Sequence, residues 1–380
     1  MSLWGHLEER FGRERPRKLL ALDGGGIRGV LTLEILAEIE RKLEAKTGVR
    51  CLGDYFDYIG GTSTGGIIAA GLSIGMTAKE LLDFYREAGA SMFEKNALLK
   101  RLKSFYTDEP LKAKLQGIFR EENGQQANLT SERLRCLLLV ITRNMTTDSS
   151  WPISSNPFAK YNDSNRKDCN RLIPLWQLVR ASTAAPVFFP PEILNWDKED
   201  PNKSFVFVDG GLTPYNNPAF LLFRIATQPA YRLNWKTGEQ NLLLVSVGTG
   251  AAAGVTDAVE RNLAGNMLNL PSELMYGIQV DQDINCRTFG RCVYGSEIDR
   301  EMGNLMLPDQ SPPEDRGRFF RYVRYNADLS QKGLDALGLS NINAAAVQKM
   351  DAVDQIENLS RVGQAVAKNE VAIEHFGSFV

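Results

Sequence analysis

A serine in a glycine-bounded turn is the residue best suited to nucleophilic chemistry in this sequence. Residues 61–65 read G-T-S-T-G, a G-x-S-x-G motif that lies between an apolar run and a helix of small residues. In that context Gly61 and Gly65 permit a sharp turn that lifts the Ser63 hydroxyl above a sheet. The helix that follows directs its positive end toward the reacting oxygen. We therefore predict that Ser63 is a nucleophile.

The shortage of histidine restricts the choice of a base for this serine. The chain has two histidines, His6 and His375, and each lies within a few residues of an end. A Ser-His-Asp triad would require one of them to fold back onto the site, so we expect a carboxylate or a lysine instead. The same shortage argues against a zinc site with histidine ligands, and we expect neither a metal nor another cofactor.

The carboxylate that we favour as the base is Asp209. It ends an apolar run at residues 205–208 and precedes Gly210, a pair that is also common in hairpin turns. Two prolines in residues 212–218 argue against a returning strand. Because parallel strands bring their carboxyl ends to one edge of a sheet, we expect Asp209 to meet Ser63 there. Partial desolvation would raise the pKa of Asp209 and make it a stronger base.

A glycine-rich corner at residues 23–29 (DGGGIRG) could hold an anion. The backbone amides of Gly24, Gly25 and Gly26 can converge near a helix N-terminus, and we predict that they form an oxyanion hole, with Arg28 bracing the loop. The segment also fits G-x-G-x-x-G, which allows the alternative of a non-catalytic nucleotide-binding module. That alternative lacks the acidic residue expected at the end of the next strand. Together the three corners predict acyl transfer to water.

The elements that must position these corners alternate along the chain. Short apolar runs indicate buried strands, and apolar residues three to four positions apart indicate amphipathic helices. Their alternation predicts an α/β fold, with a mainly parallel sheet between helices. The expected strands are residues 17–22, 55–59, 134–142, 205–208, 241–247 and 319–325, and the expected helices are residues 30–46, 67–73 and 78–93.

Composition and length limit the class of protein further. Lys and Arg number 44 against 46 for Asp and Glu, a net charge of −2 that argues against a nucleic-acid scaffold. The five cysteines form no C-x-x-C pair, and the N-terminus has no apolar signal region, so we expect reduced thiols and a cytoplasmic location. No linker separates two domains. We expect residues 17–250 to form a catalytic core and residues 251–380 a mainly helical elaboration packed on the same domain.

Taken in order, the three corners resemble the signature of the patatin-like phospholipase family. That signature is a D-G-G-G-x-R loop, a G-x-S-x-G elbow and a D-G-A/G aspartate, which stand here at residues 23–28, 61–65 and 209–211. The resemblance covers the expected catalytic core. It implies a three-layer α/β/α fold and a calcium-independent lipid acyl hydrolase that acts peripherally at a phospholipid membrane, with Ser63 as nucleophile and Asp209 as base.

Further stretches, at residues 174–186, 188–190 and 243–250, are similar to the bacterial branch of that family. Some bacterial relatives are effectors of anti-phage systems, which cyclic nucleotides switch on to degrade the host membrane. The resemblance therefore gives a second hypothesis, in which a cyclic dinucleotide activates the same hydrolase. No residue pattern identifies a nucleotide pocket, and none predicts an oligomeric state.

Four aromatic residues in expected loops could line an acyl channel or touch a membrane. They are Trp151, Phe158, Phe188 and Phe189. Burial in the core is the more common fate of any single residue of this kind.

Overall fold

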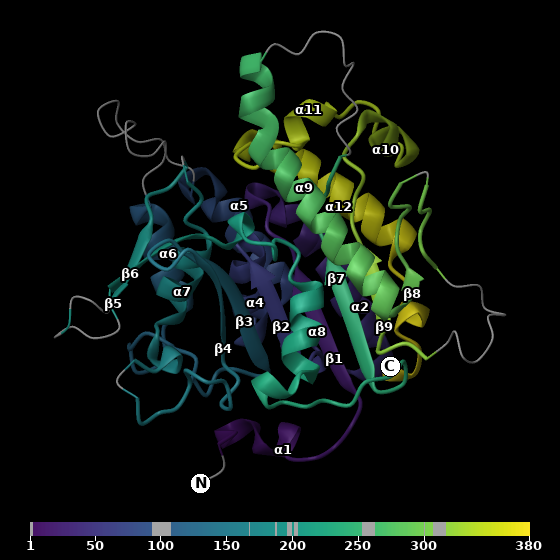
Figure 1. The fold of residues 1–380 in the computed structure, drawn as a ribbon. Coiled ribbons are helices and arrows are strands. Elements are labelled where there is room, and N and C mark those ends of the chain that lie inside the picture. Colours follow the sequence, from purple (N-terminus) through teal and green to yellow (C-terminus); the bar gives the residue numbers. More distant parts are fainter. Residues whose placement is uncertain are drawn as a thin grey trace.

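The computed structural model is built on one central sheet, for which nine strands are described (Figure 1). The order of neighbouring strands is β5-β6-β3-β2-β1-β7-β9-β8, and β4 pairs with β3. The strands are β1 (Arg17–Leu22), β2 (Tyr58–Thr62), β3 (Leu137–Asn144), β4 (Ser149–Ser154), β5 (Glu192–Asn195), β6 (Ser204–Asp209), β7 (Leu242–Val247), β8 (Arg291–Tyr294) and β9 (Arg321–Tyr325). The structure describes residues 3–92, 108–166, 168–186, 188–195, 200, 204–252, 263–299, 301–306 and 317–380.

The centre of the sheet is parallel, as the sequence predicts. β3, β2, β1, β7, β9 and β8 follow one another through parallel pairs. In β1, Leu19 and Leu20 are fully buried although they point to opposite faces. Burial on both faces is typical of parallel strands covered by helices, and it explains why β1 reads as a continuous apolar run.

β6 departs from the parallel arrangement that we predicted for it. It pairs with β3 in the antiparallel sense, with Asp209 opposite Thr142. Thr142 also pairs with β4, whereas its neighbour Ile141 pairs with Thr62 at the end of β2. β4 and β6 must therefore flank opposite sides of β3. β6 occupies the position beside β3 that becomes vacant where β2 ends at Thr62.

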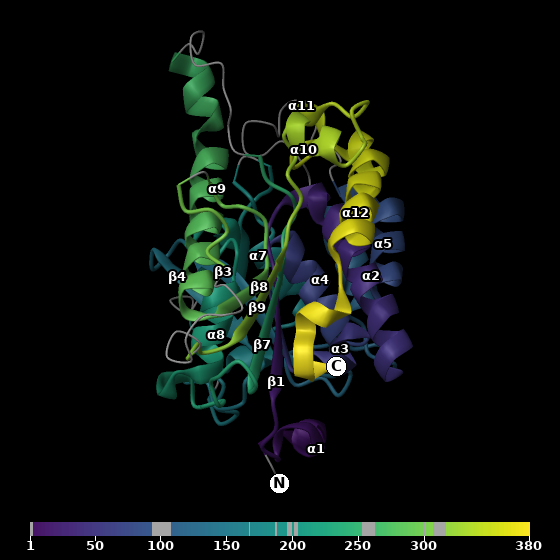
Figure 2. The same ribbon diagram turned by 90° about the vertical axis from the view of Figure 1, so that its right-hand side faces the viewer.

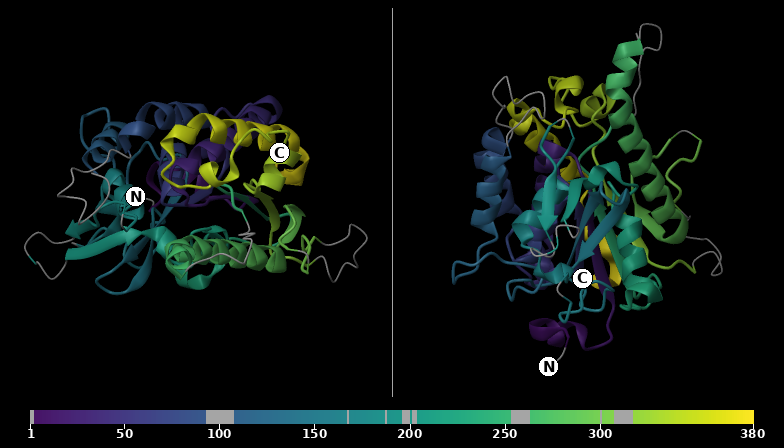
Figure 3. Two further views of the ribbon diagram at one scale, coloured as in Figure 1. Left: turned by 90° about the horizontal axis from the view of Figure 1, so that it is seen from above. Right: turned by 60° about the vertical axis from the view of Figure 1, so that its left-hand side comes forward.

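Helices cover both faces of the sheet and give a three-layer α/β/α fold (Figures 2 and 3). One layer contains α8 and α9, and the other contains α2, α4, α5 and α12. The α-helices of the described residues are α1 (Glu8–Phe11), α2 (Gly29–Thr47), α3 (Leu52–Tyr55), α4 (Thr64–Ser73), α5 (Ala78–Met92), α6 (Glu109–Ile118), α7 (Leu175–Ser182), α8 (Ala219–Thr227), α9 (Leu263–Phe289), α10 (Gln331–Ala336), α11 (Ala344–Val347) and α12 (Ile356–Glu370).

The last third of the chain contributes to the sheet as well as to the helices. β9 pairs with β7, and β8 pairs with β9, so two strands from this part extend the parallel region. α12 packs along α2, where Val362 and Val366 are fully buried. The division into a catalytic core of residues 17–250 and an elaboration of residues 251–380 on the same domain stays a prediction.

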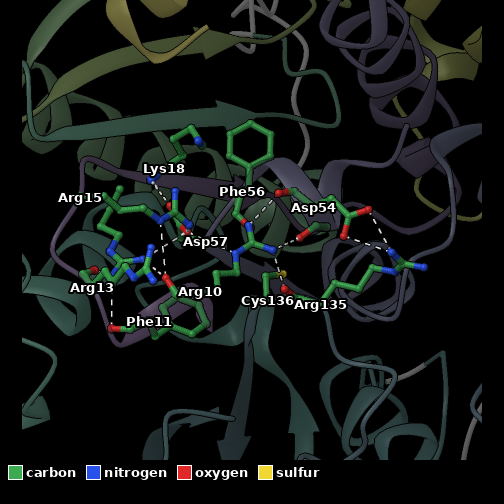
Figure 4. A network of polar contacts seen from close by, with 12 residues as sticks. Arg10, Phe11, Arg13, Arg15, Lys18, Asp54, Phe56, Asp57, Arg135 and Cys136 are labelled. Carbon is green, nitrogen blue, oxygen red and sulfur yellow. Dashed lines mark hydrogen bonds and ion pairs between the residues drawn. The ribbon is translucent and has the colours of Figure 1, made fainter. Parts of the chain in front are cut away.

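A buried carboxylate fastens the N-terminal segment to the edge of the sheet where β2 begins, opposite the end that carries Ser63 (Figure 4). Asp57 is fully buried and forms ion pairs with Arg10 and Arg15, while the backbone N–H of Lys18 donates to it at 2.9 Å. Arg10 also donates to the carbonyl of Phe56 at 2.8 Å and to other carbonyls of the same turn. The start of the chain is thus tied to the core by charge-assisted hydrogen bonds.

Candidate active site

The serine of the glycine-bounded turn stands between β2 and α4. Ser63 has φ 53° and ψ −123°, a left-handed conformation that non-glycine residues rarely adopt. Strained backbone conformations of this kind occur mainly at functional sites, where the surrounding structure holds them in place. The turn is tight, since a Cβ on Gly61 would lie 2.0 Å from the carbonyl oxygen of Gly65, and one on Gly65 would lie 2.3 Å from that of Leu22. The backbone N–H of Ser63 donates to the Ser182 hydroxyl at 2.8 Å. Glycine at these positions is therefore required by close packing.

Asp209 lies directly beside this serine. The Ser63 hydroxyl donates to Oδ2 of Asp209 at 2.7 Å, and the N–H of Gly211 donates to Oδ1 at 2.7 Å. Thr62 and Asp209 pair with consecutive residues of β3 on the same side of that strand, so the end of β6 faces the turn that follows β2. Gly210 permits this approach, since a Cβ there would lie 2.2 Å from the carbonyl oxygen of Ile141.

The surroundings of Asp209 adjust its basicity. Burial raises the pKa of Asp209 to about 6, against the lowering effects of its hydrogen bonds from Ser63 and Gly211. The Arg180 guanidinium, fully buried on α7, also acts to lower the pKa of Asp209. Arg180 donates to Asp108 at 3.1 Å and to the carbonyl of Pro190 at 2.7 Å. The sequence motifs did not single out this arginine.

The glycine-rich loop adjoins the serine from the end of β1. Its first amide is already engaged, because the N–H of Gly24 donates to the carbonyl of Asn216 at 3.0 Å. The amides of Gly25 and Gly26 have no acceptor in the described part of the chain, and both residues line the cavity that contains Ser63. Of the three predicted oxyanion donors, Gly25 and Gly26 therefore each have a backbone N–H that is free to donate to a substrate oxygen.

Two arginines fix the ends of this loop. Arg28 donates through Nε to the carbonyl of Gly25 at 3.3 Å, and burial lowers the pKa of Arg28 to about 10. Arg324, on β9, donates to both carboxylate oxygens of Asp23, at 2.9 and 2.6 Å. The sequence singled out Arg28 but gave no sign of Arg324, which no motif marks.

Ser63 and Asp209 open into an apolar cavity of about 140 Å³. Phe188 and Phe189 line it, as expected for an acyl channel. The other two aromatic residues do not line it, and they pack against other aromatic rings instead, as is more common for residues of this kind. Trp151 packs against Phe205 and Phe207 in the core, and Phe158 packs edge-on against Trp4. The other apolar side chains of the cavity include Ile67, Tyr85, Leu111, Leu212, Met275 and Met350.

This arrangement has the parts that acyl transfer requires. A hydroxyl is hydrogen-bonded to a carboxylate of raised pKa, two glycines with unpaired backbone amides line the same cavity, and an apolar wall is available for a hydrocarbon chain. Among the described residues, no group of three or more His, Cys, Asp or Glu side chains could hold a metal ion. Within the same residues, every helix is too short or too polar to cross a membrane.

Comparisons with known proteins agree with these features. Residues 20–223, more than half of the 380 residues, match the family model described as patatin-like phospholipase. A cGAMP-activated phospholipase of Vibrio cholerae is 33% identical over 218 residues, which cover 54% of this chain and 56% of the relative. Patatin-T5 of Solanum tuberosum is 30% identical over 252 residues, which cover 62% of this chain and 61% of the relative. The alignments thus span little more than half the length of these relatives.

A solved structure of human GIVD cytosolic phospholipase A2 is also similar, with a TM-score of 0.42 and 12% identity. The similarity covers 96% of this chain and 61% of that chain.

Proposed function

The chain belongs to the patatin-like phospholipase family, and from that premise we propose that it hydrolyses carboxylic esters of membrane phospholipids through an acyl-Ser63 intermediate. The observation that carries the proposal is the 2.7 Å hydrogen bond from Ser63 to Asp209 at the wall of an apolar cavity. The cavity suits a fatty acyl chain, and the paired side chains suit attack on its ester. We propose a cytoplasmic enzyme that acts peripherally at a membrane.

In the first half of the proposed reaction, Oγ of Ser63 attacks the ester carbonyl carbon. Asp209 Oδ2 accepts the hydroxyl proton as the carbonyl π electrons move to its oxygen. The amides of Gly25 and Gly26 donate to that oxyanion, and Arg28 keeps the Gly25 peptide in place through its hydrogen bond to the Gly25 carbonyl. When the intermediate collapses, the C–O bond to the alcohol breaks and the leaving lysophospholipid takes the proton from Asp209.

In the second half, water attacks the acyl-Ser63 carbonyl and Asp209 accepts a proton from that water. Collapse returns the proton to Ser63 and releases a fatty acid. A pKa of about 6 suits this double role, because Asp209 is ionised at neutral pH and is still far more basic than an ordinary aspartate. The sequence of steps needs no metal, so the proposed activity is independent of calcium.

A second candidate is activation of this hydrolase by a cyclic dinucleotide in defence against phage. Its support is the cGAMP-activated phospholipase of Vibrio cholerae, which shares 33% identity over 218 residues. In this form of the proposal the chemistry at Ser63 is unchanged and a separate ligand controls it.

The test is fatty-acid release from mixed phospholipid vesicles in EDTA, with wild type beside Ser63→Ala and with or without cyclic dinucleotides. Release by wild type alone, and none by the variant, supports a constitutive hydrolase. Release only with one nucleotide supports the activated form. If neither protein releases fatty acid under any condition, the hydrolase proposal is wrong and the glycine loop returns as a binding module.

A further inference from the structure

A second cavity, of about 380 Å³, lies at the carboxyl ends of β7 and β9 under α9. Met275 of α9 lines the cavity of Ser63, whereas the next residue, Tyr276, lines this one. The two cavities therefore share an edge of the sheet but lie over different strands. The carboxyl ends of parallel strands are where open α/β sheets usually bind ligands.

The positive charges that face this cavity are already neutralised. Arg287 forms two hydrogen bonds to Asp283, at 3.1 and 2.7 Å, and Arg324 forms two to Asp23. Both arginines are almost fully buried, so each depends on its carboxylate partner for compensation. Neither guanidinium is therefore available to an anionic ligand without breaking a buried pair.

Three negatively charged side chains stand at the cavity mouth. Glu297, Asp299 and Asp328 are exposed and line the cavity, and none of them forms an ion pair with a described residue. Tyr276 lines the same cavity as Asp299 and Asp328. Burial raises the pKa of Tyr276, and the charges of Asp328 and Asp299 raise it further. An aromatic ring beside carboxylates is the combination that recognises organic ammonium groups.

One buried polar side chain in this cavity lacks a partner. Gln279 of α9 is only 9% exposed and lines the cavity, yet its side-chain amide makes no hydrogen bond with any described residue. Because Gln279 lines the cavity, a ligand with hydrogen-bonding groups can bind this amide without breaking an existing hydrogen bond. Gln279 therefore offers a free donor and a free acceptor to a polar ligand, separately from the carboxylates.

We propose that this cavity binds an organic ammonium group, held by the carboxylates of Asp299 and Asp328, the ring of Tyr276 and the amide of Gln279. The charge of the described lining is unfavourable to phosphate, so a cyclic dinucleotide would have to bind elsewhere. Two sources supply this chemistry: a free amine, or the ammonium headgroup of a membrane lipid. The headgroup source rests on the proposed phospholipase function, and the free amine does not.

Binding is tested on the full chain carrying Ser63→Ala, so that the result does not depend on hydrolysis. Calorimetric titration with putrescine and with ethanolamine at low salt is expected to show saturable binding. The added pair Asp299→Asn and Asp328→Asn should weaken it at least about tenfold, about 1.4 kcal/mol. Asparagine can still accept the backbone hydrogen bonds that these side chains now accept, so the turns are preserved.

The matched control removes two exposed carboxylates away from the cavity, with Asp83→Asn and Asp335→Asn, and should leave binding unchanged. Co-sedimentation with phosphatidylethanolamine and phosphatidylglycerol vesicles then identifies the source. A preference for ethanolamine vesicles that the Asp299 and Asp328 changes abolish indicates the headgroup, and amine binding without that preference indicates a free amine. The proposal is overturned if neither amine nor headgroup is bound up to about 10 mM, or if both double variants bind equally.

Discussion

Arg324 donates two hydrogen bonds, of 2.9 and 2.6 Å, to the carboxylate of Asp23, which lies 301 residues earlier in the chain. Asp23 is fully buried and immediately precedes the three glycines of the loop beside Ser63. Ser246 accepts a third hydrogen bond from Arg324, at 2.7 Å. The conformation of the loop therefore depends on a strand from the last fifth of the chain.

Replacing Arg324 by lysine should impair catalysis more than binding. Lysine keeps the charge but cannot form the two-pronged contact with Asp23. We expect kcat to fall about tenfold to a hundredfold, which is less than the roughly hundredfold to thousandfold effect of removing one oxyanion donor, because the loop is displaced but keeps its amides. KM should change little, because the acyl cavity is untouched. The measurement is steady-state hydrolysis of a soluble ester.

Arg321→Lys is the control for this change, because Arg321 lies on the same strand but donates to the carbonyl of His375 instead of to the loop. It should retain nearly full kcat. Equal losses in the two variants would show that β9 acts through general stability and that the contact with Asp23 has no special role.

Asp209→Asn should abolish hydrolysis and yet stabilise the protein at neutral pH. The folded-state pKa of Asp209 is raised to about 6 from 3.8, so the folded state holds its proton more tightly than the unfolded chain does. The unfolding free energy of the wild type therefore falls as pH rises from about 4 to about 6, by up to about 3 kcal/mol from this group. The variant lacks that loss, so chemical denaturation at pH 7.5 should find it about 1–3 kcal/mol more stable.

The same carboxyl sets the pH dependence of the wild-type rate. Asp209 must be ionised to accept a proton, so kcat/KM for a soluble ester should rise with pH through about 6 and then reach a plateau. A stability difference between Asp209→Asn and wild type that persists unchanged at pH 4 would contradict the assignment. At that pH Asp209 of the folded wild type is protonated and therefore as neutral as the asparagine of the variant.

The local parts of the site could be predicted from the sequence, and the long-range parts could not. Ser63, Asp209 and the glycines beside them stand in turns whose residue types identify them at short range. The predicted parallel direction of β6 was wrong, because an apolar run indicates a strand but carries no information about the orientation of that strand in the sheet. Arg324 and Arg180 were missed for a similar reason, since their partners lie far along the chain and no local pattern marks them.

The start of β2 shows a smaller error of the same origin. Residues 55–59 were expected to form the strand, whereas α3 ends at Tyr55 and β2 begins at Tyr58. Apolar residues at the end of a short helix and at the start of a buried strand look alike in sequence. Asp57 separates the two elements, and its burial depends on arginines from the N-terminal segment.

Asp57→Asn should destabilise the fold without altering the site. Asp57 is fully buried among Arg10, Arg15 and Arg17, so removing its charge leaves these cations without compensation. We expect a loss of about 3–5 kcal/mol in unfolding free energy by denaturant titration. The kcat of the folded fraction should be unchanged, because Asp57 lies at the edge of the sheet remote from Ser63.

Asp54→Asn is the matched control for this change. Asp54 pairs with Arg135 at 3.0 Å, but the two side chains are 41% and 49% exposed. An exposed pair of this kind contributes less than about 1 kcal/mol. If both variants lose the same stability, burial of Asp57 is not what makes the contact strong.

Leu111→Trp should shorten the acyl chains that the enzyme accepts. Leu111 of α6 is 3% exposed and lines the cavity that contains Ser63, so a larger side chain there fills space that a long acyl chain would occupy. Each methylene that loses its place in an apolar pocket costs about 1–3 kcal/mol, so hydrolysis of a long-chain ester should fall by at least about tenfold relative to a butyryl ester. Leu111→Met conserves volume and should keep the wild-type ratio. Thermal unfolding of both variants separates a loss of fold from a change of preference, and an unaltered ratio in a folded Leu111→Trp protein would show that the acyl chain does not reach α6.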